Sequence, residues 1–128
     1  MYGLSATQMV INSRMLSLGW RAADRAAVDT FAPQGLRLHE DRQVVLTQYV
    51  VDTAIQTSGL GAHSATLLGI DLDVAGDPER VPPRLWVAAV ASTTQAQTFF
   101  ASRGIPTQIG RTTIEFRGES VVATTLLQ

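Results

Sequence analysis

Apolar residues in the first quarter of the chain recur at steps of three and four positions, which is the spacing of a helix. The positions that share this spacing are Met9, Val10, Met15, Leu16, Leu18, Ala22, Ala26 and Val28. Ser5 can cap the start of the pattern, Gly19 interrupts it, and Asp24 opens an alanine-rich stretch. The pattern ends before Pro33, because the residue preceding a proline is pushed out of the helical region. We therefore predict two helices between residues 5 and 31 that meet near Gly19.

The next two segments differ in how clearly they can be assigned. Leu36 and Leu38 alternate with polar residues, which predicts a short strand. The segment 42–56 is ambiguous, because its apolar spacing fits a helix while its β-branched content fits a strand. The positions that fit a helix are Val44, Val45, Gln48, Val51, Asp52 and Ile55. We favour the helix here and keep the strand as the alternative.

A pair of strands is predicted in the middle of the chain. Residues 67–74 carry leucine, isoleucine and valine at every second position, which is the clearest strand signal in the sequence. Residues 85–91 form a continuous apolar run of the kind found in buried strands. The stretch 75–83 between them is rich in glycine, proline and aspartate. We therefore predict an antiparallel pair with a long connection.

The last third of the chain predicts one short element and a hairpin. Residues 93–103 fit a short helix or a continued strand, and the following Gly104 and Pro106 end either one. Residues 112–116 and 120–127 read as two strands joined by a turn at Arg117 and Gly118. Together the elements predict an α+β fold, and the length of 128 residues suits a single domain over residues 1–128.

Composition narrows the classes of partner. The net charge is −1, and the ten basic residues are all arginines spread along the chain, so no basic patch for nucleic acid is expected. Cysteine is absent, which removes disulfides and thiolate chemistry. No apolar run is long enough to cross a membrane, and the first ten residues lack the pattern of a signal peptide. We expect a cytoplasmic protein that contacts neither membrane nor nucleic acid.

The densest cluster of titratable residues is His39-Glu40-Asp41. A histidine beside carboxylates can act as a general base near neutral pH, although a solvated strand end would carry the same residues. His63 sits among small residues and reads as a loop histidine. The sequence contains no nucleotide-binding fingerprint and no metal-binding spacing, so we expect no cofactor and no metal.

Large aromatic residues are scattered along the chain and suit either a core or the wall of an apolar pocket. The candidates for contact with a ligand are Trp20, Tyr49, Trp86 and Phe100. For Trp86, which lies inside an apolar run, packing in the core is the favoured interpretation.

Two stretches resemble a known superfamily. Residues 19–33, followed by 36–41, are similar to the helix-to-strand passage of the nuclear transport factor two-like superfamily, and in particular of its SnoaL-like polyketide cyclases. Residues 104–107, 110–111 and 116–118 are similar to that family's "G-I-P-P-T-G-R" turn and following strand. The resemblance implies a cone-shaped α+β barrel, in which N-terminal helices pack on a curved, mainly antiparallel β-sheet.

The resemblance also implies an activity. Ketosteroid isomerases and limonene epoxide hydrolases share this superfamily, so it implies a small cofactor-independent enzyme of secondary-metabolite biosynthesis, a homodimer with a hydrophobic small molecule in an apolar cavity. His39, oriented by Asp41 or Glu40, would transfer a proton in a cyclisation, isomerisation or epoxide opening, while Tyr49 or Trp86 held a ligand oxygen. The last strand departs from the family, since it offers no carboxylate and lacks the usual tryptophan.

A different class of function is compatible with the same sequence. Charged residues make up only 16% of the chain, below the usual quarter, which indicates surface hidden in the fold or covered by a partner. A non-catalytic assembly subunit of a secretion system or viral particle, with its apolar strands and terminal hairpin as an interface, is therefore the alternative. The sequence leaves open whether the protein is an enzyme.

Overall fold

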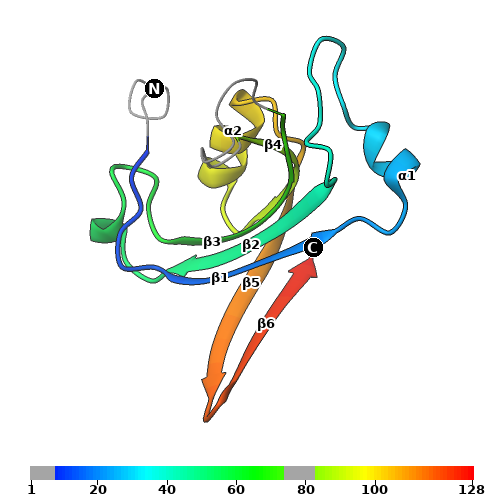
Figure 1. Ribbon diagram of the computed structural model, residues 1–128. Coiled ribbons are helices and arrows are strands. Elements are labelled where there is room, and N and C mark those ends of the chain that lie inside the picture. The colour runs from blue at the N-terminus through cyan, green and yellow to red at the C-terminus, as the bar shows by residue number, and fades with distance from the viewer. Residues whose placement is uncertain (1–7, 74–82) are drawn as a thin grey trace.

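The computed structural model describes residues 8–73 and 83–128. Six strands form one sheet in the order of the sequence, and two α-helices and a short 3₁₀ helix connect them (Figure 1). The elements are β1 (Arg14–Arg21), α1 (Arg25–Asp29), β2 (Gln43–Val51), η1 (Ala54–Gln56), β3 (His63–Asp71), β4 (Arg84–Ala91), α2 (Thr94–Ser102), β5 (Thr107–Arg117) and β6 (Ser120–Leu127). No helix in the described ranges is long and apolar enough to cross a membrane.

Neighbouring strands pair antiparallel throughout, except for β4 and β5. These two strands run parallel over a short stretch, Ala89–Ala91 against Thr107–Ile109. A parallel pair needs a crossover connection, and α2 provides it. Thr93 caps this helix by accepting a hydrogen bond from the backbone N–H of Ala96.

Of the two N-terminal helices predicted from the sequence, the first is not formed in the described residues, and the second is reduced to one short helix that Asp24 caps. Residues Arg14–Arg21 are an edge strand, and the only helix between residues 8 and 31 is the five-residue α1. In β1 the side chains of Leu16, Leu18 and Trp20 share one face, which is the two-residue alternation of a strand. The helical spacing arose from combining these residues with the alanines of a separate element, α1.

The helix that we favoured for residues 42–56 is also not formed. The alternative prediction, a strand, is correct, since Gln43–Val51 is strand β2. The buried pairs Val44–Val45 and Gln48–Tyr49 recur every four residues and so imitate a helix. This happens because β2 lies between layers that cover both of its faces, and such a strand loses its polar–apolar alternation.

The strands predicted in the second half are present, although the one predicted at 67–74 is observed as His63–Asp71. β3 and β4 pair antiparallel, and the terminal hairpin is present with Gly118 at positive φ in its two-residue turn. The segment 93–103 forms a helix, the first of its two alternatives. The predicted short strand at 36–39 is reduced to a single bridge between Leu38 and Leu72. Most of the predicted 75–83 connection lies outside the described residues.

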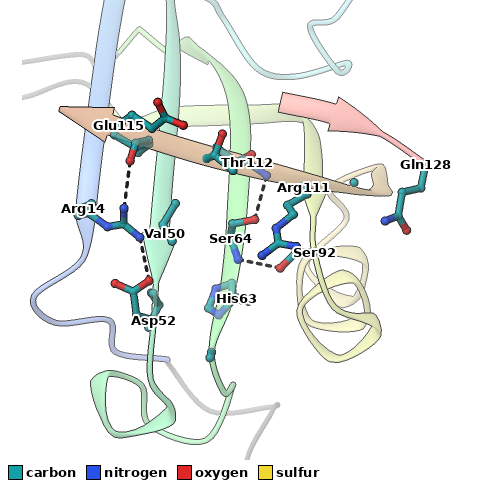
Figure 2. A pocket seen from close by; sticks show the side chains of 15 residues that line it. Arg14, Val50, Asp52, His63, Ser64, Ser92, Arg111, Thr112, Glu115 and Gln128 are labelled. Carbon is teal, nitrogen blue, oxygen red and sulfur yellow. Dashed lines mark hydrogen bonds and ion pairs between the residues drawn. The ribbon is translucent and has the colours of Figure 1, made fainter. Parts of the chain in front are cut away.

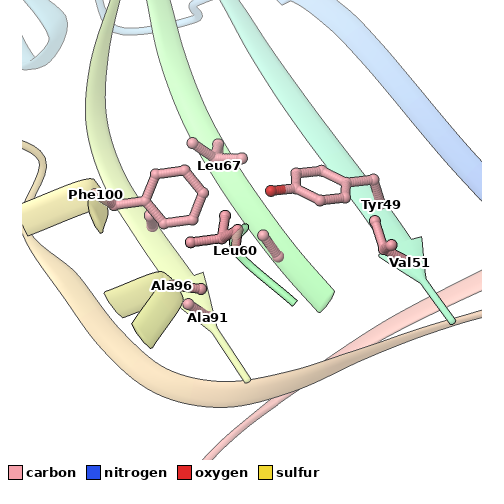
Figure 3. Packing of buried hydrophobic residues seen from close by; sticks show 9 residues of the cluster. Tyr49, Val51, Leu60, Leu67, Ala91, Ala96 and Phe100 are labelled. Atoms are coloured by element: carbon pink, nitrogen blue, oxygen red, sulfur yellow. The ribbon is translucent and has the colours of Figure 1, made fainter. Parts of the chain in front are cut away.

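One face of the sheet carries the main hydrophobic core. Side chains from β2, β3 and β4 pack there against the inner face of α2, with Leu60 between them (Figure 3). The buried members are Tyr49, Val51, Leu60, Ala65, Leu67, Ala89, Ala91, Ala96 and Phe100. Ala65, Ala91 and Ala96 are fully buried, so small side chains line the contact between α2 and the sheet.

The opposite face of the sheet is crossed by the β5–β6 hairpin. β5 leaves β4 after the short parallel stretch and runs across β3, β2 and β1, while the hairpin turn projects beyond the sheet (Figure 1). Gly110 lies at the crossing, where an added Cβ would lie only 2.5 Å from Val90 Cγ1. Glycine is required at this position because β5 lies so close to Val90 of β4 that a Cβ would not fit.

A triangle of threonine hydroxyls joins the hairpin to the sheet. The oxygens of Thr66, Thr112 and Thr125 lie 2.6 to 3.0 Å from one another, and Gln48 Nε2 donates to Thr125 Oγ1 at 3.0 Å. Each hydroxyl can donate one hydrogen bond and accept another within the triangle. The contact between the hairpin and the sheet is therefore polar, and its hydroxyl groups satisfy one another's hydrogen bonds. The buried side chain of Ile114 lies on the same strand, β5.

The predicted fold class is accordingly wrong. The chain is mainly β, with a six-stranded sheet that curls into a nearly closed barrel and a few short helices, of which α2 packs on the main core. It is not a cone-shaped α+β barrel, because strand β1 occupies the place where that fold needs a long N-terminal helix.

Candidate functional site

A groove of about 600 Å³ opens where β5 crosses the ends of β1, β2 and β3. Its walls come from four strands, β1, β2, β3 and β5, and from the residues that directly follow β4 and β6 (Figure 2). The lining residues that carry polar or charged side chains are Arg14, Asp52, His63, Ser64, Ser92, Arg111, Thr112, Thr113, Glu115 and Gln128. The groove is therefore a polar site, unlike the apolar cavity that the family resemblance implied.

Two serine hydroxyls are held in the groove by backbone donors. The N–H of Thr112 donates to Ser64 Oγ at 3.0 Å, and the N–H of Ser64 donates to Ser92 Oγ at 2.8 Å (Figure 2). Each hydroxyl oxygen thus already accepts a bond, while its own proton has no acceptor among the described residues. Both serines can donate that proton to a ligand.

Arg111 is a groove residue whose charge is not paired with any described residue. It lies on the exposed face of β5, and its side chain extends toward Ser64 and Ser92 in Figure 2. No described residue forms an ion pair or hydrogen bond with its guanidinium. A guanidinium presents several N–H donors in a planar fork that matches a carboxylate.

The other charges of the groove are engaged in the fold. Arg14 Nη2 donates to Asp52 Oδ1 at 2.8 Å and Arg14 Nη1 donates to the carbonyl oxygen of Ile114 at 3.0 Å, so this arginine joins β1 to β5. Glu115 accepts from Arg117 at 2.6 Å. The two carboxylates are thus neutralised by these arginines, which leaves Arg111 as the charge open to an anion.

His63 borders the groove, but its ring is bound within the core. Nδ1–H donates to the carbonyl oxygen of Gly61 at 2.7 Å, and Nε2 accepts from the hydroxyl of Tyr49 at 2.8 Å. Burial lowers the pKa of His63, although the bond to Gly61 opposes that shift. Burial also raises the pKa of Tyr49 far above its ordinary value. Both rings are therefore neutral and have no free position for proton transfer.

The predicted proton-transfer pair lies elsewhere. His39 borders a separate polar hollow of about 470 Å³, together with Arg25, Arg37 and Arg42. The N–H of Asp41 donates to His39 Nδ1 at 3.2 Å, and the nearest carboxylate oxygen of Asp41 is 3.8 Å from the same nitrogen. The catalytic roles of His39 and Asp41 stay predictions. No three His, Asp or Glu side chains converge as a metal site in the part of the chain that is described.

The predicted ligand-binding aromatics are not gathered around one cavity. Tyr49 and Phe100 are buried in the main core, and Trp86 packs at its margin with Arg84 over its ring. Trp20 is half exposed on the edge strand β1. Three of the four therefore have a packing role here, as the sequence favoured for Trp86, and their contact with a ligand stays a prediction.

The sequence patterns did not identify Ser64, Ser92 or Arg111 as candidate site residues. Ser64 and Ser92 acquire their positions from backbone donors at positions 112 and 64, far away along the chain. The one available signal was Arg111, the single charged residue in the segment 107–114.

No protein-family model matches the sequence, and no curated protein sequence matches it. Solved structures with the same fold are found. An acetoacetate decarboxylase from Legionella pneumophila subsp. pneumophila str. Philadelphia 1 superposes with a TM-score of 0.71 and 10% identity, covering 94% of this chain and 45% of that one. A second acetoacetate decarboxylase structure gives 0.68 and 17%, covering 92% and 45%.

A third neighbour is the enduracididine biosynthesis enzyme MppR complexed with pyruvate, with a TM-score of 0.61 and 15% identity over 84% of this chain and 43% of that one. The chain thus spans less than half the length of each neighbour. At these identities the likeness concerns the fold alone. It corrects the resemblance to nuclear transport factor two-like proteins and SnoaL-like cyclases, because the chain has the fold of acetoacetate decarboxylase and MppR instead.

Proposed function

We propose that this chain binds a small carboxylate-bearing molecule, of the size of a short oxo acid, in the groove crossed by β5. Arg111 binds the carboxylate, and the hydroxyls of Ser64 and Ser92 donate hydrogen bonds to the same ligand. The observation that carries the proposal is an unpaired guanidinium beside two hydroxyls with uncommitted protons. A groove of about 600 Å³ leaves ample room for a small ligand together with ordered water.

The structural neighbours support this class of ligand. Acetoacetate decarboxylase is named for a 3-oxo acid, and the MppR structure contains pyruvate, a 2-oxo acid. Both molecules join a carboxylate to a carbonyl group within a few atoms. Such a ligand offers an anion to Arg111 and a neutral acceptor to a serine hydroxyl.

The chain restricts the chemistry that can follow binding. An amine nucleophile can form a Schiff base with the carbonyl of an oxo acid, and a lysine usually supplies that amine. All ten basic residues of this sequence are arginines, so these 128 residues contain no lysine side chain that could do so. The groove therefore recognises and orients an oxo acid by charge and hydrogen bonds, without a covalent lysine adduct.

Isothermal titration calorimetry with pyruvate and acetoacetate tests the proposal, with acetone as the probe that lacks a carboxylate. We expect both acids to bind and acetone not to bind. Arg111→Gln should weaken binding by about tenfold or more, because a charge-assisted hydrogen bond contributes roughly 1.5–3 kcal/mol. Arg21→Gln is the matched control, since Arg21 is 78% exposed on β1 and does not line the groove.

A second substitution separates hydrogen bonding from charge. Ser92→Ala removes one donor and leaves Arg111 in place, so it should weaken binding of the acids by several fold. If Arg111→Gln and Arg21→Gln bound the acids equally well, the carboxylate site would lie elsewhere. Equal affinity for acetone and acetoacetate would show that the groove does not recognise the anion.

A further inference from the structure

Among the described residues, none pairs with the outer edge of β6. Of its two neighbours in a sheet it has only β5, and no described backbone group bonds to its other side. Its eight residues, Ser-Val-Val-Ala-Thr-Thr-Leu-Leu, contain no charge and no proline. Monomeric proteins usually protect such an edge with charges, proline or a covering element, because it otherwise pairs with another chain.

The register of the hairpin fixes which groups point outward. The two-residue turn joins Arg117 to Ser120, and the N–H of Gln128 donates to the carbonyl oxygen of Ile109. Bonded and non-bonded positions alternate in an antiparallel pair, so the even-numbered residues of β6 bond to β5. The free N–H and C=O groups on the outer edge therefore belong to the odd-numbered residues 121 to 127.

The side chains of β6 are arranged symmetrically along the strand. Two exposed apolar residues lie at its start, Val121 (44%) and Val122 (37%), and two lie at its end, Leu126 (67%) and Leu127 (62%). Small or hydroxyl-bearing residues lie between them, with Thr124 at the centre. An antiparallel copy of the same strand, centred on Thr124, would place each valine opposite a leucine on the same face.

We propose that β6 pairs antiparallel with β6 of a second copy, about a two-fold axis at Thr124. In this register the odd-numbered residues 121 to 127 exchange backbone hydrogen bonds with the partner strand, and no charge is brought opposite another. Each exposed valine of one copy then packs against an exposed leucine of the other copy. The partner that pairs with β6 is a second copy of the chain because the strand is complementary to itself, as an isologous two-fold interface requires.

Thr124 offers a direct test, because the chain has no cysteine. On the axis, Thr124 faces its own copy at a non-hydrogen-bonded position, where Cα atoms lie about 4.5 Å apart. That spacing is within the range of a disulfide. Under mild oxidation, Thr124→Cys should therefore become a covalent dimer on a non-reducing gel. The matched control is Thr113→Cys, since Thr113 is also exposed and lies directly opposite Thr124 on β5, away from the axis.

Sedimentation equilibrium completes the test. We expect the wild-type protein to be a dimer, and Thr124→Arg to raise its dissociation constant at least about tenfold by placing like charges together, whereas Thr113→Arg leaves it unchanged. Two results would overturn the proposal: a monomeric wild-type protein, or a Thr124→Cys variant that cross-links no more than Thr113→Cys. Neither experiment depends on ligand binding in the groove.

Discussion

Thr112→Val is the substitution that tests how the hairpin is held to the sheet. Valine has nearly the same shape as threonine, so the change removes one hydroxyl and leaves the packing and the backbone bond from Thr112 N–H to Ser64 intact. Thr112 is only 2% exposed. The hydroxyl takes part in two contacts of the triangle, at 2.7 Å to Thr66 and 3.0 Å to Thr125.

The expected loss of stability follows from those two contacts. Each hydrogen bond contributes about 1 kcal/mol net, and one neighbouring hydroxyl proton is left buried without an acceptor. We therefore expect Thr112→Val to lower the free energy of unfolding by about 2 kcal/mol. The double variant Thr112→Val with Thr125→Val should cost less than the sum of the two single variants, because residues that share a network couple by about 0.5–3 kcal/mol.

Urea denaturation followed by tryptophan fluorescence measures both quantities. Thr113→Val is the control, because Thr113 is exposed on the other face of the same strand and takes no part in the triangle. A loss below about 0.5 kcal/mol for Thr112→Val, or strictly additive single and double variants, would refute the network as the link between the two layers.

Three further results are expected. Tyr49→Phe leaves His63 Nε2 without its donor and should lower the free energy of unfolding by about 1–2 kcal/mol in urea denaturation. Because burial raises the pKa of Tyr49, the wild-type protein should also lose stability as the pH rises above about 10, and the variant should not. Burial lowers the pKa of His63, so the unfolded chain takes up the proton first and stability should fall as the pH drops below about 6.5, an effect that His63→Gln should reduce. Asp71→Asn breaks the 2.9 Å ion pair with the partly buried Arg84 and should lower the free energy of unfolding by about 2 kcal/mol, measured by thermal unfolding against Asp73→Asn.

The sequence predicts the second half of this fold better than the first, for a physical reason. In β3, β4 and the hairpin, neighbouring strands are close in the sequence, and the turn at Gly118 marks where the chain reverses. Local alternation and turn residues are enough to identify such elements. The first half depends on contacts that sequence patterns do not show.

Strand β2 demonstrates that limit most clearly. One face is buried by the core under α2. The other face is buried by the crossing hairpin and, at Val44, by a cluster with Val28 and Leu38. Strand β1 was mistaken for a helix for a different reason. Its apolar side chains are not buried in a core, since Leu18 and Trp20 on this edge strand stay about half exposed. The candidate groove could not be predicted for the same reason, since the partners of Ser64 and Ser92 come from other strands.

A crystal structure of the protein with acetoacetate bound is the most direct test of the proposed ligand site. We predict that the carboxylate of the ligand lies about 2.8 Å from the guanidinium of Arg111, with the hydroxyl of Ser64 or Ser92 donating to the same molecule. Electron density for the ligand in the hollow beside His39 and Arg37, with the groove filled only by water, would contradict it.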